Sequence, residues 1–241
     1  MNHSFRKDQW LTGQIGKVAY QLQIKEMISP LFFHDWENLK KNHTKEKFFV
    51  FSKISTDAID IWQCLETADF KLIDTNLKFE LHGNISFEKK QKKDIEICFA
   101  EEKHQEATGD IAKNNFFYSR FHLDPLLDNN IANQIKQNWV KNYFSGKRGD
   151  EMVLALMNGK PIGFLQLIIK DSELLIDLIG VDKIAQGKGV ASAMIQFAKK
   201  KITRSYIKVG TQICNLPSIK LYQKLGFVLS GSDYVFHYHN K

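Results

Sequence analysis

The six residues Gln186-Gly187-Lys188-Gly189-Val190-Ala191 form a loop with the composition of a phosphate site. Two glycines allow the backbone to turn sharply and to bring its N–H groups close to a ligand. The loop leads into a helical pattern over residues 190–202, so it ends at a helix N-terminus. Unpaired N–H groups and the helix dipole favour an anion there, and a diphosphate is the expected ligand.

Two common phosphate-binding motifs do not fit this loop. A Walker A loop needs Ser or Thr after its lysine, but Gly189 follows Lys188. A dinucleotide-binding loop needs a third glycine where Ser192 stands, within a parallel βαβ unit. A tight connection between a strand and a helix, with no ligand, is the alternative interpretation.

Two segments together resemble the motifs of the GNAT superfamily of N-acetyltransferases. Gln186, Gly189 and Ala191 match its Gln/Arg-x-x-Gly-x-Gly/Ala loop. Asn215–Phe227 resembles its Asn-x-x-Ala-x-x-Leu-Tyr-x-x-x-Gly-Phe signature, with Ser218 in place of the alanine. The resemblance implies acetyl-CoA as acetyl donor. It also implies a GNAT fold of the α/β (α+β) class, in which helices flank a central mixed, mostly antiparallel sheet.

The resemblance also implies roles for individual residues. In the family, the strand before the loop pairs with the pantetheine arm of the cofactor, and the loop amides hold its pyrophosphate. Tyr222 would protonate the departing thiolate, whose ordinary pKa is about 8.5. Alternatively, Tyr222 only braces its helix, and Asn215 only caps it. The implied cofactor-binding residues are Leu178, Ile179, Gly180, Val181, Gln186, Gly187, Lys188, Gly189, Val190, Ala191 and Asn215.

The base that deprotonates the amine is left open by the sequence. Asp177 interrupts an apolar strand, where an unpaired carboxylate is unfavourable. It could act as a base, anchor the substrate, or lie beside a bulge. His122, His237 and His239 are weaker candidates, and some enzymes of this family use ordered water.

Residues outside the two motifs must recognise the acetyl acceptor. The chain resembles the TDP-fucosamine acetyltransferases, which acetylate TDP-4-amino-4,6-dideoxygalactose, at Ser119–Phe121, Gly210–Gln212 and Asn215–Tyr222. Arginine suits a diphosphate, and an aromatic ring suits a nucleobase or sugar face. A surface arginine and a core phenylalanine are the alternatives. The implied acceptor-binding residues are Arg120, Phe121, Asp177 and Gln212.

Hydrophobic periodicity predicts the elements that position these residues. The charged run Phe87–Asp94 separates a smaller N-terminal α/β domain, residues 1–90, from an acetyltransferase domain, residues 91–241. Strands are expected at 15–24, 71–81, 95–99, 151–156, 162–170, 174–181 and 205–212, and one or two at 227–238. Helices are expected at 57–68, 101–112, 129–144, 190–202 and 218–225.

Composition limits the remaining possibilities. The three cysteines form no CxxC pair, which argues against a disulfide framework and a zinc site, so no metal is expected. No apolar window has the length of a signal peptide or membrane span, and a cytoplasmic location is expected. The net charge of +7 suits phosphorylated ligands, but aromatic residues are not interleaved with the basic clusters as single-strand binding favours.

The predicted partner is therefore a small-molecule acceptor, without nucleic acid or membrane. The C-terminal strand Tyr234–His239 could pair across a homodimer. Two other functions are compatible with the motifs. One is a GNAT enzyme that acetylates a protein N-terminus, a lysine or a polyamine. The other is a non-catalytic module that binds acyl-CoA or associates with nucleic acid, because fold alone does not fix function.

Overall fold

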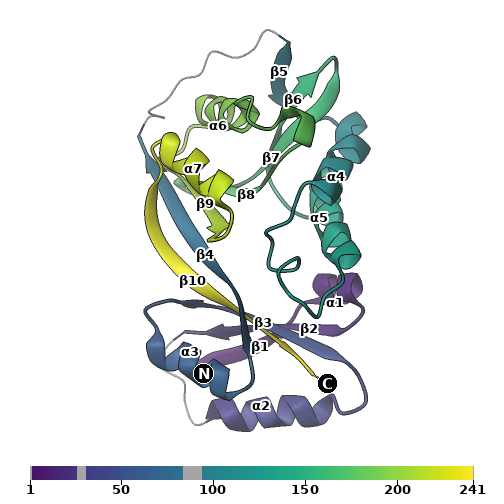
Figure 1. Cartoon of the computed structure of the whole chain (residues 1–241), viewed down its shortest axis with the longest axis vertical. Coiled ribbons are helices and arrows are strands. Elements are labelled where there is room, and N and C mark those ends of the chain that lie inside the picture. Colours follow the sequence, from purple (N-terminus) through teal and green to yellow (C-terminus); the bar gives the residue numbers. More distant parts are fainter. Residues whose placement is uncertain (1, 26–30, 84–93, 241) are drawn as a thin grey trace. The chain divides into compact units, whose positions relative to one another are not determined.

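The computed structural model describes residues 2–25, 31–83 and 94–240, which form two compact units (Figure 1). Unit 1 comprises Met1–Asn76, Ser119–Ile131 and Gly231–Lys241, and unit 2 comprises Leu77–Tyr118 and Ala132–Ser230. Each unit is therefore assembled from separate stretches of chain. The sequence-based domain boundary, between residues 90 and 91, lies outside the described residues.

Ten strands and seven α-helices make up the described part of the chain. The strands are β1 (His3–Lys7), β2 (Val18–Ile24), β3 (Phe48–Ser55), β4 (Lys71–His82), β5 (Ile95–Phe99), β6 (Glu151–Met157), β7 (Lys160–Lys170), β8 (Glu173–Val181), β9 (Tyr206–Gln212) and β10 (Val228–His239). The α-helices are α1 (Gln9–Ile15), α2 (Leu31–Asn42), α3 (Ile59–Thr67), α4 (Gln105–Asn114), α5 (Asn129–Phe144), α6 (Val190–Lys201) and α7 (Leu216–Lys224).

The strand order is β1-β2-β3-β10-β4-β9-β8-β7-β6-β5. Strands β5 to β8 pair antiparallel with their neighbours in the order β5-β6-β7-β8, whereas β8 with β9 and β2 with β3 are parallel pairs. The expected mixed, mostly antiparallel sheet with flanking helices is confirmed.

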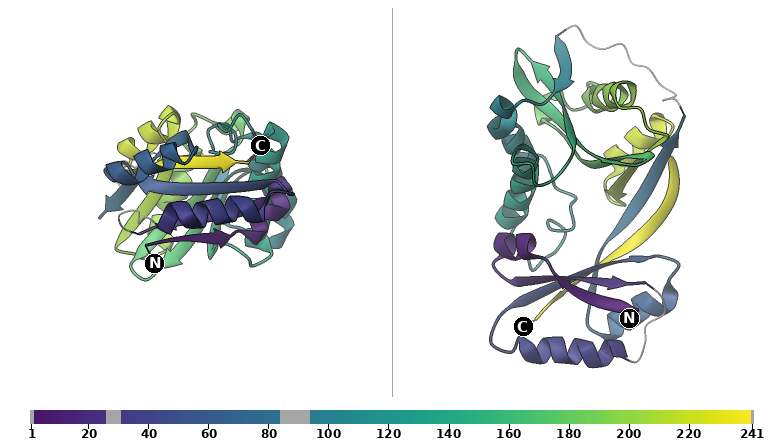
Figure 2. Two further views of the ribbon diagram at one scale, coloured as in Figure 1. Left: turned by 90° about the horizontal axis from the view of Figure 1, so that it is seen from below. Right: turned by 180° about the vertical axis from the view of Figure 1, so that it is seen from behind.

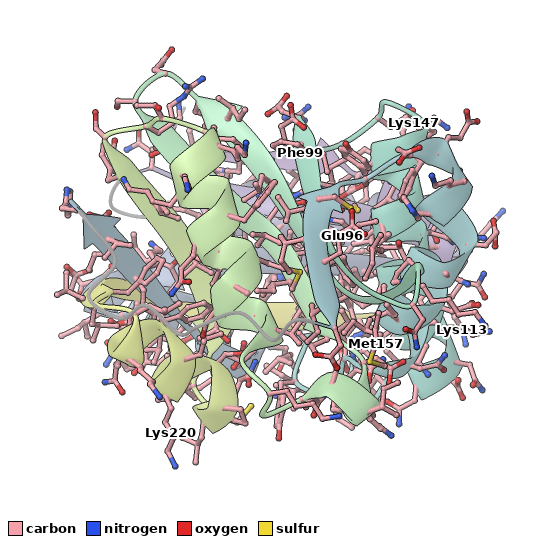
Figure 3. All side chains as sticks on the ribbon, turned by 90° about the horizontal axis from the view of Figure 1, so that it is seen from above. Glu96, Phe99, Lys113, Lys147, Met157 and Lys220 are labelled. Atoms are coloured by element: carbon pink, nitrogen blue, oxygen red, sulfur yellow. The ribbon has the colours of Figure 1, made fainter. Side chains whose placement is uncertain are left out.

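Unit 2 has an apolar core on each face of its strands. Alternate residues of a strand point to opposite faces, so Leu165 and Leu167 pack with α6, whereas Phe164 packs with α4 and α5. Figure 3 shows α6 on one side of β5 and α4 with α5 on the other. Val190, Met194 and Ala198 are the buried residues of α6 at helical spacing. The central strands of unit 2 are therefore covered by helices on both faces.

Unit 1 has a separate core, rich in aromatic residues. Phe32 and Trp36 of α2 and Leu65 of α3 are buried against Leu22 of β2 and Val50 of β3. Helices α2 and α3 lie on the same face of these strands (Figure 2). Unit 1 therefore combines helices and strands around one core.

The predicted elements downstream of residue 120 all occur, and their ends differ from the expected ones by at most two residues. Two upstream predictions were inaccurate. The strand expected at 15–24 begins only at Val18, because residues 9–15 form α1, which ends at Gly16 with φ 66°. The helix expected at 101–112 is a 3₁₀ turn, Glu102–His104, followed by α4. None of the described helices is long and apolar enough to span a membrane.

Candidate functional site

The central feature of unit 2 is an opening between two parallel strands, β8 and β9. Their pairing covers only Glu173–Ile176 opposite Tyr206–Val209, although β8 continues to Val181 and β9 to Gln212. Beyond Ile176 the strands separate, and within the described residues no strand pairs with the edge of β8 that faces β9. An extended chain with amide groups can hydrogen-bond to such an edge, as an added strand does.

The glycine loop follows directly on this open edge. Asp182 accepts a hydrogen bond from Ile184 N–H at 3.0 Å, and Gln186 Nε2 donates to the Val181 carbonyl at 3.0 Å. These bonds fix the loop to the end of β8. Gly187 and Gly189 then take φ values of 72° and 87°, in the left-handed region that favours glycine. The loop conformation is thus specified by these two glycines.

The backbone N–H groups of this loop and of the first turn of α6 form a set of donors. Among the described residues, the N–H groups of Gly187, Gly189, Val190 and Ala191 have no hydrogen-bond acceptor. No side chain caps α6, and its first turn contains no acidic residue. Such a helix N-terminus suits a diphosphate. These residues therefore fit the pyrophosphate of acetyl-CoA, and the open edge beside them fits its pantetheine arm.

Two aromatic rings pack closely against the end of β8. A Cβ atom on Gly180 would lie 2.6 Å from Phe164 Cε1 and 3.3 Å from Phe116 Cε2. Only glycine allows the strand to pass these rings without a shift. Leu178 packs into the same α4/α5 core, whereas Ile179 and Val181 pack on the α6 face. Leu178 and Gly180 can therefore contact a cofactor through backbone atoms but not through exposed side chains.

Tyr222 of α7 is 1% exposed and lies in the unit 2 core. Its ring centroid is 5.9 Å from that of Phe79 and 5.5 Å from that of Phe227. Burial raises the pKa of the phenol, so the hydroxyl keeps its proton at neutral pH. Within the described residues this hydroxyl has no hydrogen-bond partner. Tyr222 is thus both a packed core residue and a proton donor with no acceptor of its own.

Asn215 caps α7, which was the structural alternative for this residue. Its Oδ1 accepts from Ser218 N–H at 3.3 Å, and its Nδ2 donates to Thr211 Oγ1 at 3.2 Å. The serine that replaces the usual alanine thus takes part in the cap through its backbone. Gln212 is the last residue of β9 and is half-buried. Both residues lie at the end of the strand that borders the opening.

Asp177 lies at a bulge in β8, since Gln166 of β7 faces Leu178 and the next residue, Leu167, faces Ile176. Its carboxylate is 6% exposed and accepts several hydrogen bonds. Arg148 donates through Nε at 2.8 Å and Nη2 at 2.6 Å, Trp139 Nε1 donates at 2.8 Å, and Gln166 Nε2 at 3.2 Å.

This network leaves the Asp177 carboxylate fully hydrogen-bonded within unit 2. Of the three roles considered for Asp177, this arrangement supports a structural residue at a bulge rather than a general base or a substrate anchor. Trp139, Arg148 and Gln166 were not predicted from the sequence. Their distances from Asp177 along the chain, 38, 29 and 11 residues, give no local signal.

Arg120 and Phe121 belong to unit 1, as do His122, His237 and His239. Phe121 is 1% exposed, so its ring is a core group and presents no open face in this structure. The Arg120 guanidinium lies 3.9 Å from the ring centroid of Phe51 and 4.4 Å from that of Phe121. His122 Nδ1 lies 2.6 Å from Ser119 Oγ within a turn of the same segment. His237 and His239 both contact Asp124, a residue that the sequence did not single out.

Comparisons with known proteins agree with this geometry. Residues 114–227 match the model of the acetyltransferase (GNAT) family. The spore coat polysaccharide biosynthesis protein SpsD of Bacillus subtilis (strain 168) is 33% identical over 135 residues, 55% of this chain and 46% of that protein. A streptothricin acetyltransferase of Escherichia coli is 36% identical over 100 residues, 39% of this chain and 58% of that protein. The chain thus spans about half the length of these relatives.

A solved structure shares the fold across nearly the whole chain. The GCN5-related N-acetyltransferase from Sphaerobacter thermophilus superposes with a TM-score of 0.67, over 98% of this chain and 76% of that one, at 11% identity. That identity shows the fold alone. Together with the family match and the loop geometry, it supports one conclusion: the chain has a GNAT-like fold, and its residues 114–227 match the acetyltransferase (GNAT) family.

Proposed function

We propose that this protein transfers the acetyl group of acetyl-CoA to the amine of a nucleotide-linked amino-deoxysugar, such as TDP-4-amino-4,6-dideoxygalactose. The observation that supports acetyl-CoA binding is the open edge of β8 at Leu178–Val181, which continues into the unpaired amides of Gly187–Ala191. The relative named for spore coat polysaccharide biosynthesis favours a sugar acceptor, and the streptothricin acetyltransferase favours a small molecule.

The chemistry follows from the proposed positions. The amine nitrogen attacks the thioester carbonyl carbon, the C–S bond breaks, and the sulfur leaves with the bonding electron pair. Tyr222 donates a hydrogen bond and then its proton to that sulfur, and the amine loses one proton to restore the balance. Its raised pKa makes Tyr222 a weak acid, so its main contribution is the hydrogen bond that stabilises the developing thiolate.

No side chain is assigned as the base that removes the proton from the amine. Asp177 already accepts hydrogen bonds from Arg148, Trp139 and Gln166, so the proposal assigns it no proton transfer. An amine that reaches the site unprotonated needs only water to take its proton after attack. The proposed acetyl transfer therefore needs one acidic side chain, Tyr222, and water.

The test is a free-thiol assay with acetyl-CoA and several acceptors. Turnover is expected with the sugar nucleotide and should be much slower with a peptide amine or a polyamine. Tyr222→Phe should lower turnover while the affinity for CoA stays within about twofold. Thiol release with the peptide or polyamine alone would overturn the sugar acceptor. CoA binding without release for any acceptor would support a non-catalytic module instead.

A further inference from the structure

The opening between β8 and β9 begins at the bulge of β8. The two strands pair as far as Ile176, and the next residue, Asp177, is the extra residue that has no counterpart on β7. A bulge bends its strand and increases the local twist. The bend in β8 therefore lies at the point where this strand leaves β9.

The bulge also changes the face to which the side chains of β8 point. Leu174 and Ile176, before the bulge, pack on the α6 face, whereas Leu178, after it, packs into the α4/α5 core. In a regular strand all three side chains would point to one face. Gly180 lies two residues beyond Leu178, so its close fit against Phe164 also depends on the extra residue.

Three segments of unit 2 hold the Asp177 carboxylate at the bulge. Trp139 donates a hydrogen bond from α5, Arg148 from the loop between α5 and β6, and Gln166 from β7. Arg148 donates two, from Nε and Nη2, and such a pair fixes the orientation of a carboxylate as well as its distance. Because the carboxylate is 6% exposed, water competes little for these hydrogen bonds.

The donors are themselves fixed within unit 2. The Arg148 guanidinium lies 4.3 Å from the ring centroid of Trp139, and the backbone N–H of Arg148 donates to the Asn142 carbonyl of α5 at 3.2 Å. Gly149 has φ 88°, and a Cβ atom there would lie 3.1 Å from Gln166 Nε2. This glycine therefore allows the loop that carries Arg148 to lie directly against Gln166.

These side-chain hydrogen bonds fix a residue that the backbone ladder does not. The extra residue of a bulge is left out of the ladder of backbone hydrogen bonds. The side chain of Asp177 therefore fixes the direction in which β8 continues. Leu178–Val181 follows directly, and a chain that pairs with this open edge needs its amide groups at the spacing of a strand.

We propose that the side chains around Asp177 are positioning residues for the cofactor, because they fix the bulge that turns the end of β8 away from β9. They are Trp139, Arg148 and Gln166. This role rests on the proposed acetyl-CoA site and involves unit 2 alone. None of these residues belongs to the loop Gln186–Ala191, so loss of the network should weaken binding of the pantetheine arm but not of the pyrophosphate.

Calorimetric titration with CoA and with adenosine 3′-phosphate 5′-diphosphate, which lacks the pantetheine arm, tests this difference. Arg148→Met removes both hydrogen bonds of the guanidinium and should weaken CoA binding by about tenfold or more, with the nucleotide affinity within about twofold of wild type. Arg148 is 41% exposed, so the variant should fold, as its circular dichroism spectrum can verify. Equal losses for the two ligands, or no loss for CoA, would overturn the positioning role.

Lys208→Gln is the matched control at the other end of the same strands. Lys208 of β9 pairs with Glu173 of β8 at 2.8 Å, where the two strands are still paired. The substitution removes a cationic partner from a carboxylate of β8, as Arg148→Met does, but away from the bulge. It should change neither affinity. A loss of CoA affinity equal to that of Arg148→Met would contradict a specific role of the bulge.

A double-mutant cycle tests whether Arg148 acts through Asp177. Asp177→Asn alone should also weaken CoA binding, and the double variant should lose no more than about twofold beyond the larger single loss, because residues that share one contact are not additive. The KM for acetyl-CoA should rise in all three variants, whereas the turnover number at saturating acetyl-CoA should stay within a few-fold. Additive losses of CoA affinity would refute action through Asp177.

The positioning role and the proposed function fail in different ways. CoA binding that depends on Arg148, without acetylation of the sugar nucleotide, would support the positioning role and refute the proposed acceptor. Acetylation of the sugar nucleotide with an unchanged KM for acetyl-CoA in Arg148→Met would support the function and refute the positioning role. A wild type that does not bind CoA would overturn both.

Discussion

Substitution of Asp177 separates its two main readings, a structural carboxylate and a general base. Asp177→Asn keeps an oxygen for the donors but removes the charge and turns an NH₂ group toward Arg148. Hydrogen bonds to a charged group contribute about 1.5–3 kcal/mol each, and exposed ion pairs about 0–1 kcal/mol. Arg148 is 41% exposed, so its share is small. We expect a loss of about 2 kcal/mol in the free energy of unfolding.

Asp177→Ala removes the acceptor altogether. The buried Gln166 keeps only its 3.4 Å hydrogen bond to the Arg148 carbonyl, and the half-buried Trp139 indole loses Asp177, an acceptor that water does not readily replace. An unsatisfied buried donor costs about 1–3 kcal/mol, which gives a total loss of about 4 kcal/mol. Guanidinium chloride unfolding at pH 7 measures both values. Glu173→Gln is the matched control, a carboxylate on the same strand that pairs with Lys208 at 2.8 Å at the surface, and it should lose much less.

The turnover number of Asp177→Asn distinguishes a structural carboxylate from a general base. If Asp177 is structural, the turnover number of Asp177→Asn at 25 °C should stay within a few-fold of wild type, since the protein remains folded. Removal of a general base lowers turnover by about 10²–10⁴-fold. A loss of that size in Asp177→Asn, with stability near wild type, would refute the structural account of the carboxylate.

Three further predictions concern the cofactor site and pH. Tyr222→Phe should lower kcat about 10²–10⁴-fold with little change in CoA affinity, as measured by thiol release and calorimetry, and wild-type kcat would exclude a role in proton donation. Gly189→Ala places a side chain at φ 87° and should weaken CoA binding at least tenfold, with a strain of about 1–3 kcal/mol; unchanged CoA affinity would contradict the loop assignment. Burial lowers the pKa of His237 to about 4, so between pH 6.5 and 4 the unfolded chain binds a proton that the folded protein does not. As pH drops through this window, the unfolding free energy of wild type should fall by up to about 3 kcal/mol more than that of His237→Gln, because other groups, such as Asp74 with its pKa raised to about 6, act alike in both proteins. An equal pH dependence of the two proteins would refute the assignment.

The sequence predicted the parts of the site that are local in the chain. The glycine loop, Tyr222 and the Asn215 cap each lie within one short motif, whose backbone preferences act over a few residues. The opening beside Leu178–Val181 is different, because it depends on where β8 stops pairing with β9, a strand about thirty residues further along. The resemblance to a family implied that opening, but periodicity alone could not.

Hydrogen-bond networks between side chains that are far apart in the sequence were not predicted. Asp124 and His237 of unit 1 are 113 residues apart in the sequence, yet Asp124 Oδ2 lies 2.6 Å from His237 Nδ1. In the same unit, the buried run Phe48–Ile54 does not alternate cleanly, so periodicity cannot distinguish a buried strand from a helix. The ring of Phe121 was predicted to face the acceptor but is buried. Its burial follows from contacts with residues that are distant in the sequence, which sequence patterns do not reveal.

The most direct test of the central claim is thiol release from acetyl-CoA with TDP-4-amino-4,6-dideoxygalactose, measured for wild type and Tyr222→Phe side by side. We expect release that depends on the sugar nucleotide, accompanied by an acetylated amine, and a loss of about 10²-fold or more in the variant. No release with the sugar nucleotide, or equal rates in the two proteins, would contradict it.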